Sequence, residues 1–144
     1  MTKLRRSIVV SMLLAVAACA APPSPLPPSQ NITVEQPTFR QVGIASWYGK
    51  AHQGRMTANG ETFDMREMTA AHRKLAFGTV VRVTNLANGK SIKVRINDRG
   101  PYVDGRILDL SAAAARQLGI GENGTAEVQI EAFASDQKME QAVK

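Results

Sequence analysis

Short stretches in which apolar and polar residues alternate recur along the middle of the chain, and they constrain the fold more than any other feature. The alternation is present at Val42–Ser46, Val81–Thr84, Ile92–Ile96 and Ala126–Ala132. A period of two residues is the pattern of a strand with one buried face. The turn residues Ala87–Gly89 separate two of these stretches and predict a β-hairpin. The domain is therefore expected to consist mainly of β-strands.

A short apolar strand and one helix complete the predicted domain. The strand is Ile107–Leu110, and Ser111 after it is a suitable N-cap for an alanine-rich helix at Ala112–Leu118 that Gly119 ends. Several short strands with one helix suggest a compact β-barrel. The span from 42 to 133 is long enough for one small domain with a single core.

The N-terminus has the pattern of an export signal. A positive start containing Lys3, Arg5 and Arg6 precedes the short apolar run Ile8–Val16. This run is too short to span a bilayer, which needs about 20 apolar residues, but it has the length of a signal-peptide core. Residues 1–18 are therefore expected to be a signal peptide.

Cys19 is the only cysteine, and small residues precede it directly in Val16-Ala17-Ala18-Cys19. This segment resembles the bacterial lipoprotein processing site, which implies cleavage before Cys19 and attachment of lipid to it. The alternative is an ordinary signal peptide cleaved near Ala20, which would leave an unremarkable thiol. A lone cysteine cannot form an internal disulfide, which lipidation explains in an exported protein.

The segment 19–41 is expected to be a tether between a membrane and the domain. Five of the nine residues in APPSPLPPS, at 21–29, are proline, and such a stretch is extended by about 3.1 Å per residue. The protein would then be anchored by lipid without spanning the membrane. Ala20, where an acidic residue would indicate the inner membrane, favours the outer membrane, with the domain in the periplasm.

The charge of the mature chain argues against a nucleic-acid partner. The formal net charge is +6 for the whole chain, and removing Lys3, Arg5 and Arg6 with the signal peptide leaves +3. No long basic run or RNA-binding signature is present. A mild positive charge is compatible with an anionic cell wall.

The run Asn97-Asp98-Arg99-Gly100-Pro101-Tyr102 places a carboxylate, a guanidinium, a turn and an aromatic ring close together. The preceding alternation places Asp98 where a strand ends, and functional residues often collect at such turns. Two interpretations remain open. Asp98 could cap the turn and pair with Arg99, or the run could form a carbohydrate-binding or catalytic site with Tyr102 lining the cleft.

Other residues are candidates for the same site. Aromatic faces stack on sugar rings, so Trp47 and Tyr48 could line a groove, although Trp47 could equally fill the core. Glu61 follows the turn pair Asn59-Gly60 and could be either a solvated turn charge or a directed carboxylate. His72, taken alone, is more typical of a hydrogen-bonding scaffold residue. No paired spacing such as HExxH occurs, so neither a metal nor a cofactor is expected.

Several motifs together resemble the rare lipoprotein A (RlpA) family. They are GIASWYG at 43–49, GRMTANGETFD at 54–64, MTAAHRKLAFGTVVRVTNL at 68–86, NGKSIKVRINDRGPY at 88–102 and GRILDLSAAAARQLG at 105–119. The resemblance implies a six-stranded double-psi β-barrel with one or two short helices. The chain differs at His52-Gln53-Gly54, where the family has an aromatic residue, His and Gly. Residues 134–144 are expected to form a polar tail in place of the family's common SPOR repeat.

By this resemblance, the chain is an endolytic lytic transglycosylase that cleaves the MurNAc–GlcNAc β-1,4 bond of peptidoglycan, in glycan strands poor in stem peptides. The family's functional trio falls on Glu61, His72 and Asp98. The C6 hydroxyl of muramic acid replaces water as nucleophile and leaves a 1,6-anhydro end, so one residue, Asp98 in our hypothesis, acts first as acid and then as base.

The expected substrate-binding residues are Trp47, Tyr48, Asn59, Arg99 and Tyr102. The expected partners are peptidoglycan glycan strands, a membrane and, by the resemblance, cell-division proteins. Two alternatives remain: a non-catalytic glycan-binding or cell-division scaffold with an expansin-like barrel, and an ordinary hydrolase.

Overall fold

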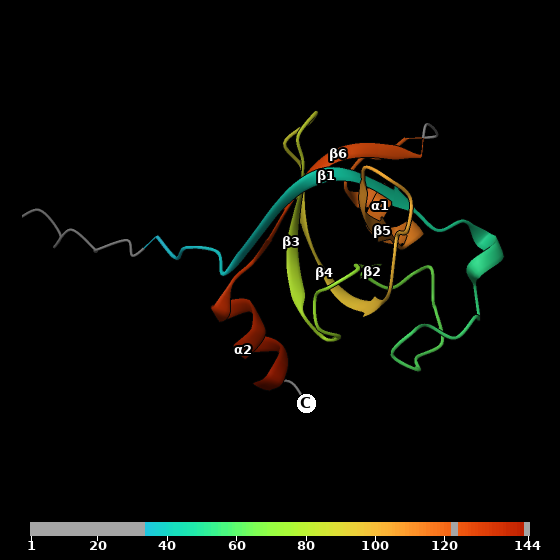
Figure 1. Cartoon of the computed structure of the whole chain (residues 1–144), viewed down its shortest axis with the longest axis horizontal. Coiled ribbons are helices and arrows are strands. Elements are labelled where there is room, and N and C mark those ends of the chain that lie inside the picture. Colours follow the sequence, from blue (N-terminus) through green and yellow to red (C-terminus); the bar gives the residue numbers. More distant parts are fainter. Residues whose placement is uncertain (1–33, 122–123, 143–144) are drawn as a thin grey trace, which may run out of the picture. The chain divides into compact units, whose positions relative to one another are not determined.

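The structure is a computed structural model that describes residues 34–121 and 124–142. They form a closed six-stranded barrel with two α-helices (Figure 1), which confirms the mainly β barrel expected from the alternation. The strands and helices are β1 (Phe39–Trp47), β2 (Thr69–Ala71), β3 (Val80–Asn85), β4 (Ser91–Asp98), β5 (Arg106–Leu110), α1 (Ala112–Gln117), β6 (Thr125–Ala132) and α2 (Ala134–Ala142), with a 3₁₀ turn, η1 (Lys50–His52), after β1. The expected signal peptide, Cys19 and proline-rich segment lie outside the described residues.

The strands follow the order β1-β5-β2-β4-β3-β6 around the barrel. Two neighbouring pairs are parallel, β1 with β5 and β2 with β4, and the other pairs are antiparallel. The predicted hairpin is the β3–β4 pair, in which Val81 lies opposite Val94. At the end of β4, Asp98 lies opposite Ala71 of β2. The barrel thus brings the end of β4 against a segment that precedes it by more than 20 residues.

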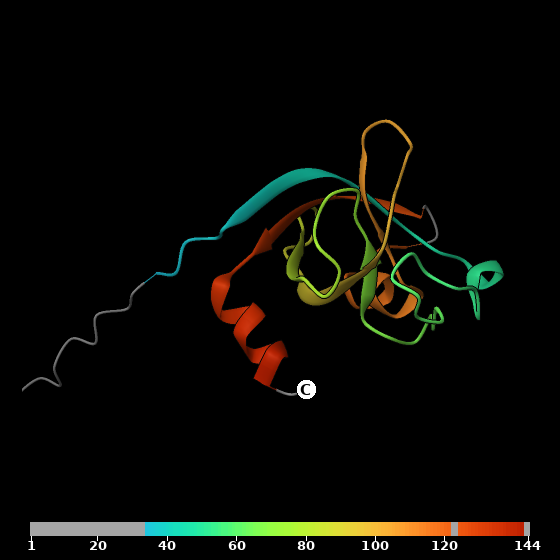
Figure 2. The ribbon, with the colours of Figure 1, turned by 60° about the horizontal axis from the view of Figure 1, so that its bottom comes forward.

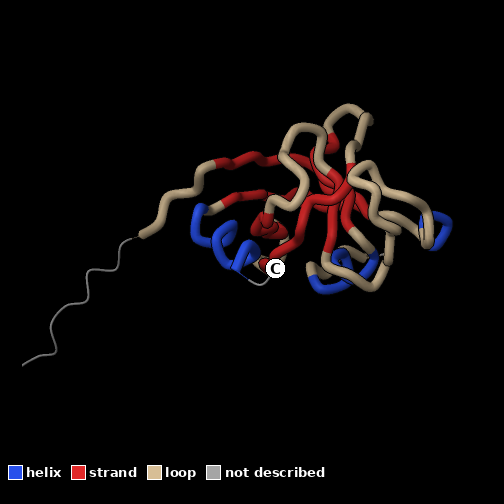
Figure 3. The backbone as a smooth tube through the Cα atoms, turned by 90° about the horizontal axis from the view of Figure 1, so that it is seen from below, coloured by secondary structure: helices blue, strands red, loops and turns tan. Residues whose placement is uncertain are grey.

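Most of the apolar residues of the alternating stretches point into the barrel and are buried. On β4, Val94 and Ile96 are fully buried, as are Val128 and Ile130 on β6. Burying an aliphatic side chain of this size contributes about 1.5–3 kcal/mol, so these inward residues fix the register of each strand. Figure 3 shows the strands together at the centre with the helices around them.

The predicted helix is present as α1. The Ser111 side chain accepts a hydrogen bond from the Ala114 amide at 3.2 Å and so caps the first turn. Gly119 follows the helix with φ +69°, a conformation that glycine adopts without steric cost. The buried side chains Ala112, Ala114 and Ala115 are small, so the helix backbone packs closely on the barrel.

The start of β1 and the short strand β2 were not expected from the sequence. β1 begins at Phe39, three residues before the expected domain boundary, because Phe39 to Gln41 pair with Ala132 to Ile130 of β6. β2 has only three residues, which is too short to show a period of two.

The C-terminal segment, expected to be a polar tail, forms the helix α2, which contacts β3 and lies beside it in Figure 1. Polar contacts hold this helix in place. Asp136 is buried and pairs with Lys93 at 2.6 Å, and the Gln137 carboxamide exchanges hydrogen bonds with the backbone of Val80. In the described part of the chain, no helix is long and apolar enough to cross a membrane.

Candidate active site

Asp98 is the last residue of β4 and is half-buried. Its Oδ1 atom accepts hydrogen bonds from the amides of Ala58, at 2.9 Å, and Arg99, at 2.8 Å. Its Oδ2 atom accepts one from the Tyr48 hydroxyl at 3.3 Å. All three contacts use the side chain of Asp98 as a hydrogen-bond acceptor, and Asp98 lies at the strand end that the sequence predicted.

Tyr48, the residue after β1, provides the side-chain donor. Burial, reinforced by the charge of Asp98, raises the pKa of the Tyr48 hydroxyl well above its ordinary value, so it keeps its proton and donates to Asp98. The ring is fixed from two sides, edge-on to Phe63 at 5.3 Å and tilted against His52 at 4.8 Å. Tyr48 therefore lies beside the predicted catalytic residue, and its predicted role in binding substrate stays a prediction.

The backbone donor from Ala58 comes from a loop that is fastened internally. The Asn59 carboxamide oxygen accepts hydrogen bonds from the Thr57 hydroxyl at 2.6 Å and the Glu61 amide at 3.1 Å. The Asn59 amide in turn donates to the Asn97 carbonyl at 3.3 Å. Asn59, predicted to bind substrate, thus has its oxygen engaged in holding the loop across the end of β4.

The carboxylate of Glu61 is tied to β4 beside Asp98. Arg95 donates to both of its oxygens, at 2.8 and 3.0 Å, and Asn97 donates at 3.3 Å. The hydrogen bonds from Arg95 are the main cause that lowers the pKa of Glu61. Arg95 and Asn97 lie on β4, the strand that ends at Asp98. Glu61 is therefore an ionised anchor of the loop and a poor proton donor.

The ring of His72, which follows β2, is engaged at both nitrogens. Nδ1 accepts hydrogen bonds from the amides of Lys74, at 3.1 Å, and Leu75, at 3.0 Å. Nε2 therefore carries the proton and donates to the Gln41 side chain at 3.1 Å. Burial is the main cause that lowers the pKa of His72. The ring is neutral, and His72 is linked to Asp98 through its backbone, whose amide donates to the Asp98 carbonyl at 3.2 Å.

Arg99 is held by the loop that His72 organises. Its Nη1 atom donates to the carbonyls of His72, at 3.2 Å, and Leu75, at 2.8 Å. The guanidinium lies over the ring of Phe77 at 3.8 Å from the ring centre, an arrangement with cation–π attraction. The described ion pairs of the chain do not include one between Arg99 and Asp98, so the two residues do not form the simple turn pair that the sequence left open.

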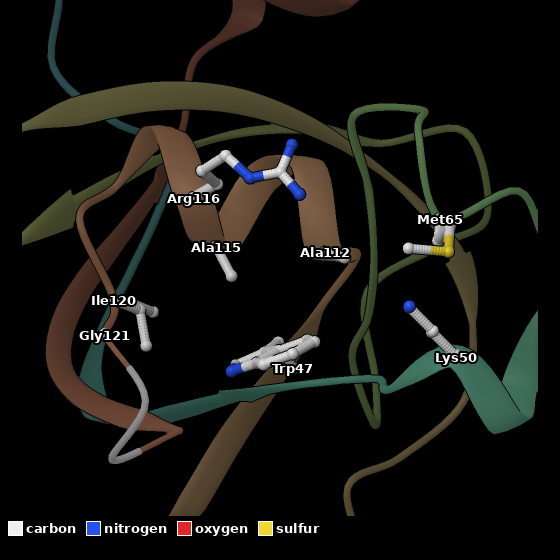
Figure 4. Close-up of a pocket in the computed structure, with 8 residues that line it drawn as sticks. All are labelled: Trp47, Lys50, Met65, Ala112, Ala115, Arg116, Ile120 and Gly121. Atoms are coloured by element: carbon white, nitrogen blue, oxygen red, sulfur yellow. The ribbon is translucent and has the colours of Figure 1, made fainter.

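The loop between β4 and β5 stands out from the barrel in Figure 2. Gly100 has φ +117°, where a larger residue would be strained, and the chain turns there directly after Asp98. Tyr102 on this loop is 76% exposed, so its ring is free to contact a ligand. Trp47 packs against the core and also lines a pocket beside α1 (Figure 4), and its predicted contact with a sugar ring stays a prediction.

The three predicted residues, Glu61, His72 and Asp98, therefore lie around the end of β4. The carboxylate of Asp98 accepts hydrogen bonds from three separate segments of the chain, whereas the side-chain donors to Glu61 both come from β4. Sequence reasoning missed the Ala58 amide, the Gln41 partner of His72 and the Phe77 ring. A backbone donor leaves no side-chain signal, whereas the aromatic residue before Gly78 could have been singled out.

Gln53, where the resemblance expects a histidine, accepts a hydrogen bond from the Met65 amide at 2.8 Å. Within the described residues, no three His, Cys, Asp or Glu side chains are grouped to hold a metal ion.

Comparison with known families gives a match over most of the barrel. A family model described as lytic transglycolase matches residues 40–130. A Pseudomonas aeruginosa protein named endolytic peptidoglycan transglycosylase RlpA is 58% identical over 93 residues, which are 65% of this chain and 27% of that protein. The Vibrio cholerae protein of the same name is 55% identical over 98 residues, 68% of this chain and 37% of that protein. The chain thus spans well under half the length of these relatives.

Solved structures share the barrel. A Streptomyces papain inhibitor superposes with a TM-score of 0.54 at 22% identity, over 66% of this chain and 94% of that one. The expansin of Clavibacter michiganensis superposes with a TM-score of 0.51 at 25% identity, over 64% of this chain and 49% of that one. A mutant of this expansin was solved in complex with cellohexaose.

Proposed function

The chain belongs to the lytic transglycolase family of double-psi β-barrels, the RlpA family that its motifs resemble, and on this basis we propose that it is an endolytic peptidoglycan lytic transglycosylase. The substrate would be the β-1,4 bond between MurNAc and GlcNAc, in glycan strands poor in stem peptides. The reaction is a lyase type of cleavage that consumes no water. The relatives named for this activity are longer proteins, of which this chain covers 27% and 37%. The activity of this chain is therefore a proposal.

The observation that carries the proposal is the set of donors around Asp98. Donors from Tyr48 after β1, from the 57–61 loop and from the turn after β4 converge on one carboxylate, which a residue that merely capped its own turn would not need. Oδ1 accepts both backbone donors, so Oδ2, with a single neutral donor from Tyr48, is the atom available to the substrate. Asp98 is placed to exchange a proton with a bound sugar at Oδ2.

The reaction balances with one proton carrier. The C6 oxygen of muramic acid attacks its own C1 as the bond from C1 to the leaving O4 breaks, and the C6 hydroxyl proton ends on O4. Asp98 accepts this proton from the C6 hydroxyl and returns it to O4, so it ends the reaction in the state in which it began. In this proposal Asp98 acts as base before it acts as acid, whereas the hypothesis from the sequence has the acid step first.

Glu61 and His72 support this centre in different ways. Glu61 fastens the loop whose Ala58 amide binds Asp98, and His72 fastens the loop that holds Arg99. Both are positioning residues in this proposal. Arg99 and Tyr102 form the substrate-facing wall beside Asp98.

The test is digestion of purified peptide-free glycan strands, followed by mass spectrometry of the products. Transglycosylation gives 1,6-anhydro ends, which are lighter by one water molecule than the reducing ends made by a hydrolase. Anhydro products from the wild-type protein, absent with Asp98→Asn, are expected. Reducing ends, or no cleavage by the wild-type protein, would overturn the proposal.

A second candidate is a non-catalytic glycan-binding module, supported by the likeness of the barrel to an expansin. In that case the strands would bind without being cut, and Asp98→Asn would change affinity but no product. The same digestion, accompanied by a strand pull-down, separates this candidate from the enzyme.

We also propose that lipid on Cys19 anchors the protein to the outer membrane, facing the periplasm, where it could meet cell-division proteins. The support is the small-residue run before Cys19 and the alanine after it. Labelled palmitate should enter the wild-type protein and not Cys19→Ser, and membrane fractionation should place the wild-type protein with outer-membrane markers. Label in Cys19→Ser would contradict this.

A further inference from the structure

A second concave site lies beside α1. The indole of Trp47, at the end of β1, forms one wall, and Ala112, Ala115 and Ile120 line the pocket from α1 and the segment after it (Figure 4). The pocket has a volume of about 470 Å³, within the range of about 300–1,000 Å³ that is usual for small-ligand sites. The lining residues named above are apolar, and the indole of Trp47 gives the pocket one large aromatic face.

Two cations stand at the edge of this pocket. Figure 4 shows the Arg116 guanidinium reaching over it from α1 and the Lys50 side chain pointing towards it from η1. Both residues are exposed. Among residues 34–121 and 124–142, neither side chain has a hydrogen-bond or ion-pair partner. Two cations that flank an apolar pocket without an acidic partner match a ligand with an apolar face and one negative group.

We propose that this pocket binds a muramic acid residue of the glycan strand, with the sugar ring against Trp47 and the free lactyl carboxylate between Lys50 and Arg116. Of the two sugars in the strand, only muramic acid carries a carboxylate, and this group is free only where the stem peptide has been removed. The inference rests on the proposed function, because it takes the same polymer as ligand.

The location of the pocket suits a subsite for a polymer. Trp47 precedes Tyr48, which binds Asp98, so the pocket and the candidate catalytic carboxylate are linked through consecutive residues of the chain. The Trp47 side chain faces α1, whereas Tyr48 faces Asp98, and a strand in contact with both would be held at two points. The pocket would thereby select strands by the state of their lactyl groups, separately from the chemistry at Asp98.

Trp47 allows this proposal to be tested without cleavage, because it is the only tryptophan in the chain. Its fluorescence in the full-length protein carrying Asp98→Asn would be titrated with three probes. These are peptide-free glycan strands, the same strands with their carboxylates converted to amides, and chitin oligosaccharides of equal length. We expect the first probe to change the fluorescence with an affinity about three- to tenfold higher than the other two, the range expected for contacts with exposed charges.

The double variant Lys50→Gln, Arg116→Gln should reduce the affinity for unmodified strands to that for the amidated strands. The matched control is Lys138→Gln on α2, an exposed cation far along the chain from the pocket, which should keep the preference. Equal affinity of the wild-type pocket for all three probes, or a preference that survives in the double variant, would overturn the proposal.

The two proposals fail separately. If the Trp47 fluorescence distinguishes the probes while wild-type protein cuts no strand, the enzyme proposal is wrong and the pocket stands. If anhydro products form while the fluorescence does not distinguish the probes, the enzyme proposal stands and the pocket is wrong.

Discussion

The Tyr48 hydroxyl lies 3.3 Å from Oδ2 of Asp98 and donates a hydrogen bond to it, although the two residues are 50 positions apart in the chain. The raised pKa of Tyr48 keeps this donor protonated across the physiological range. In the proposed mechanism Oδ2 is also the atom that exchanges a proton with the substrate, so the Tyr48 hydroxyl would orient this atom without supplying the proton. This relationship gives the first prediction.

Tyr48→Phe should slow glycan cleavage about 10- to 100-fold, the effect of losing a hydrogen bond to a charged group worth about 1.5–3 kcal/mol. The fold should persist, because the ring contacts with Phe63 and His52 do not need the hydroxyl. Product release measured by mass spectrometry checks this. Thr84→Val, which removes a hydroxyl bonded to Ser91 on the hairpin, is the control and should cleave normally. Full activity in Tyr48→Phe would show that the donor has no catalytic role.

Asp98→Asn should reduce cleavage by at least about 100-fold, since general acid–base groups contribute about 10²–10⁴-fold. The amide cannot carry the proton between C6 and O4, and its nitrogen would face donors where the carboxylate accepts. Asp104→Asn, an exposed carboxylate on the neighbouring loop, is the matched control and should retain the wild-type rate. A small, equal loss in both variants would point away from Asp98.

Glu61→Gln should lower the midpoint of thermal unfolding at pH 7, because it weakens the two hydrogen bonds from Arg95 that fasten the 57–61 loop. The Glu61 side chain is 42% exposed, so the loss should stay below about 1 kcal/mol. The pKa of Glu61 is lower in the folded state than when unfolded. Its stabilisation is thus complete above about pH 4.5 and is lost as the pH falls through the lowered pKa.

The difference between wild type and Glu61→Gln should therefore shrink when the unfolding midpoint is measured at pH 3. Glu67→Gln, at an exposed position outside the 57–61 loop, would serve as the comparison and should show no such change. A difference that is the same at pH 7 and pH 3 would contradict the assignment of Glu61 as an ionised anchor.

The sequence predicted those parts of the molecule that depend on neighbouring residues. Asp98 is the last residue of β4 because the alternation of Val94 and Ile96 ends there, and α1 starts after Ser111 because its hydroxyl caps the helix. Both features are local, and both were confirmed.

Long-range pairing left no such signal. The three residues of β2 are too few for a period, and their parallel pairing with β4 depends on the closed barrel. The state of the His72 ring depends on the amides of Lys74 and Leu75, which only the folded turn directs at Nδ1. The sequence therefore pointed to residues that lie around the end of β4, but it did not predict the tautomer of His72 or the backbone amides that bind its ring.

His72 allows these roles to be separated by pH. Burial lowers its pKa below the value of about 6.5 that it has in an unfolded chain, so below pH 6.5 the unfolded state binds the proton more readily. Stability should therefore be complete above pH 6.5 and fall as the pH drops from there towards the lowered pKa. His72→Asn keeps an oxygen near the place of Nδ1 to accept the loop amides, but it does not titrate, so this part of the pH dependence should disappear.

Thermal unfolding between pH 5 and pH 8 measures this effect, and His52→Asn is the matched control, because His52 is the only other histidine and is exposed. Glycan cleavage provides the second readout. If His72 only positions Arg99 through the 72–75 loop, His72→Asn should retain much more activity than His72→Ala, with an unchanged pH–rate profile. If His72 instead transfers a proton, both variants should be equally inactive, and the roles proposed for His72 and Asp98 would have to be revised.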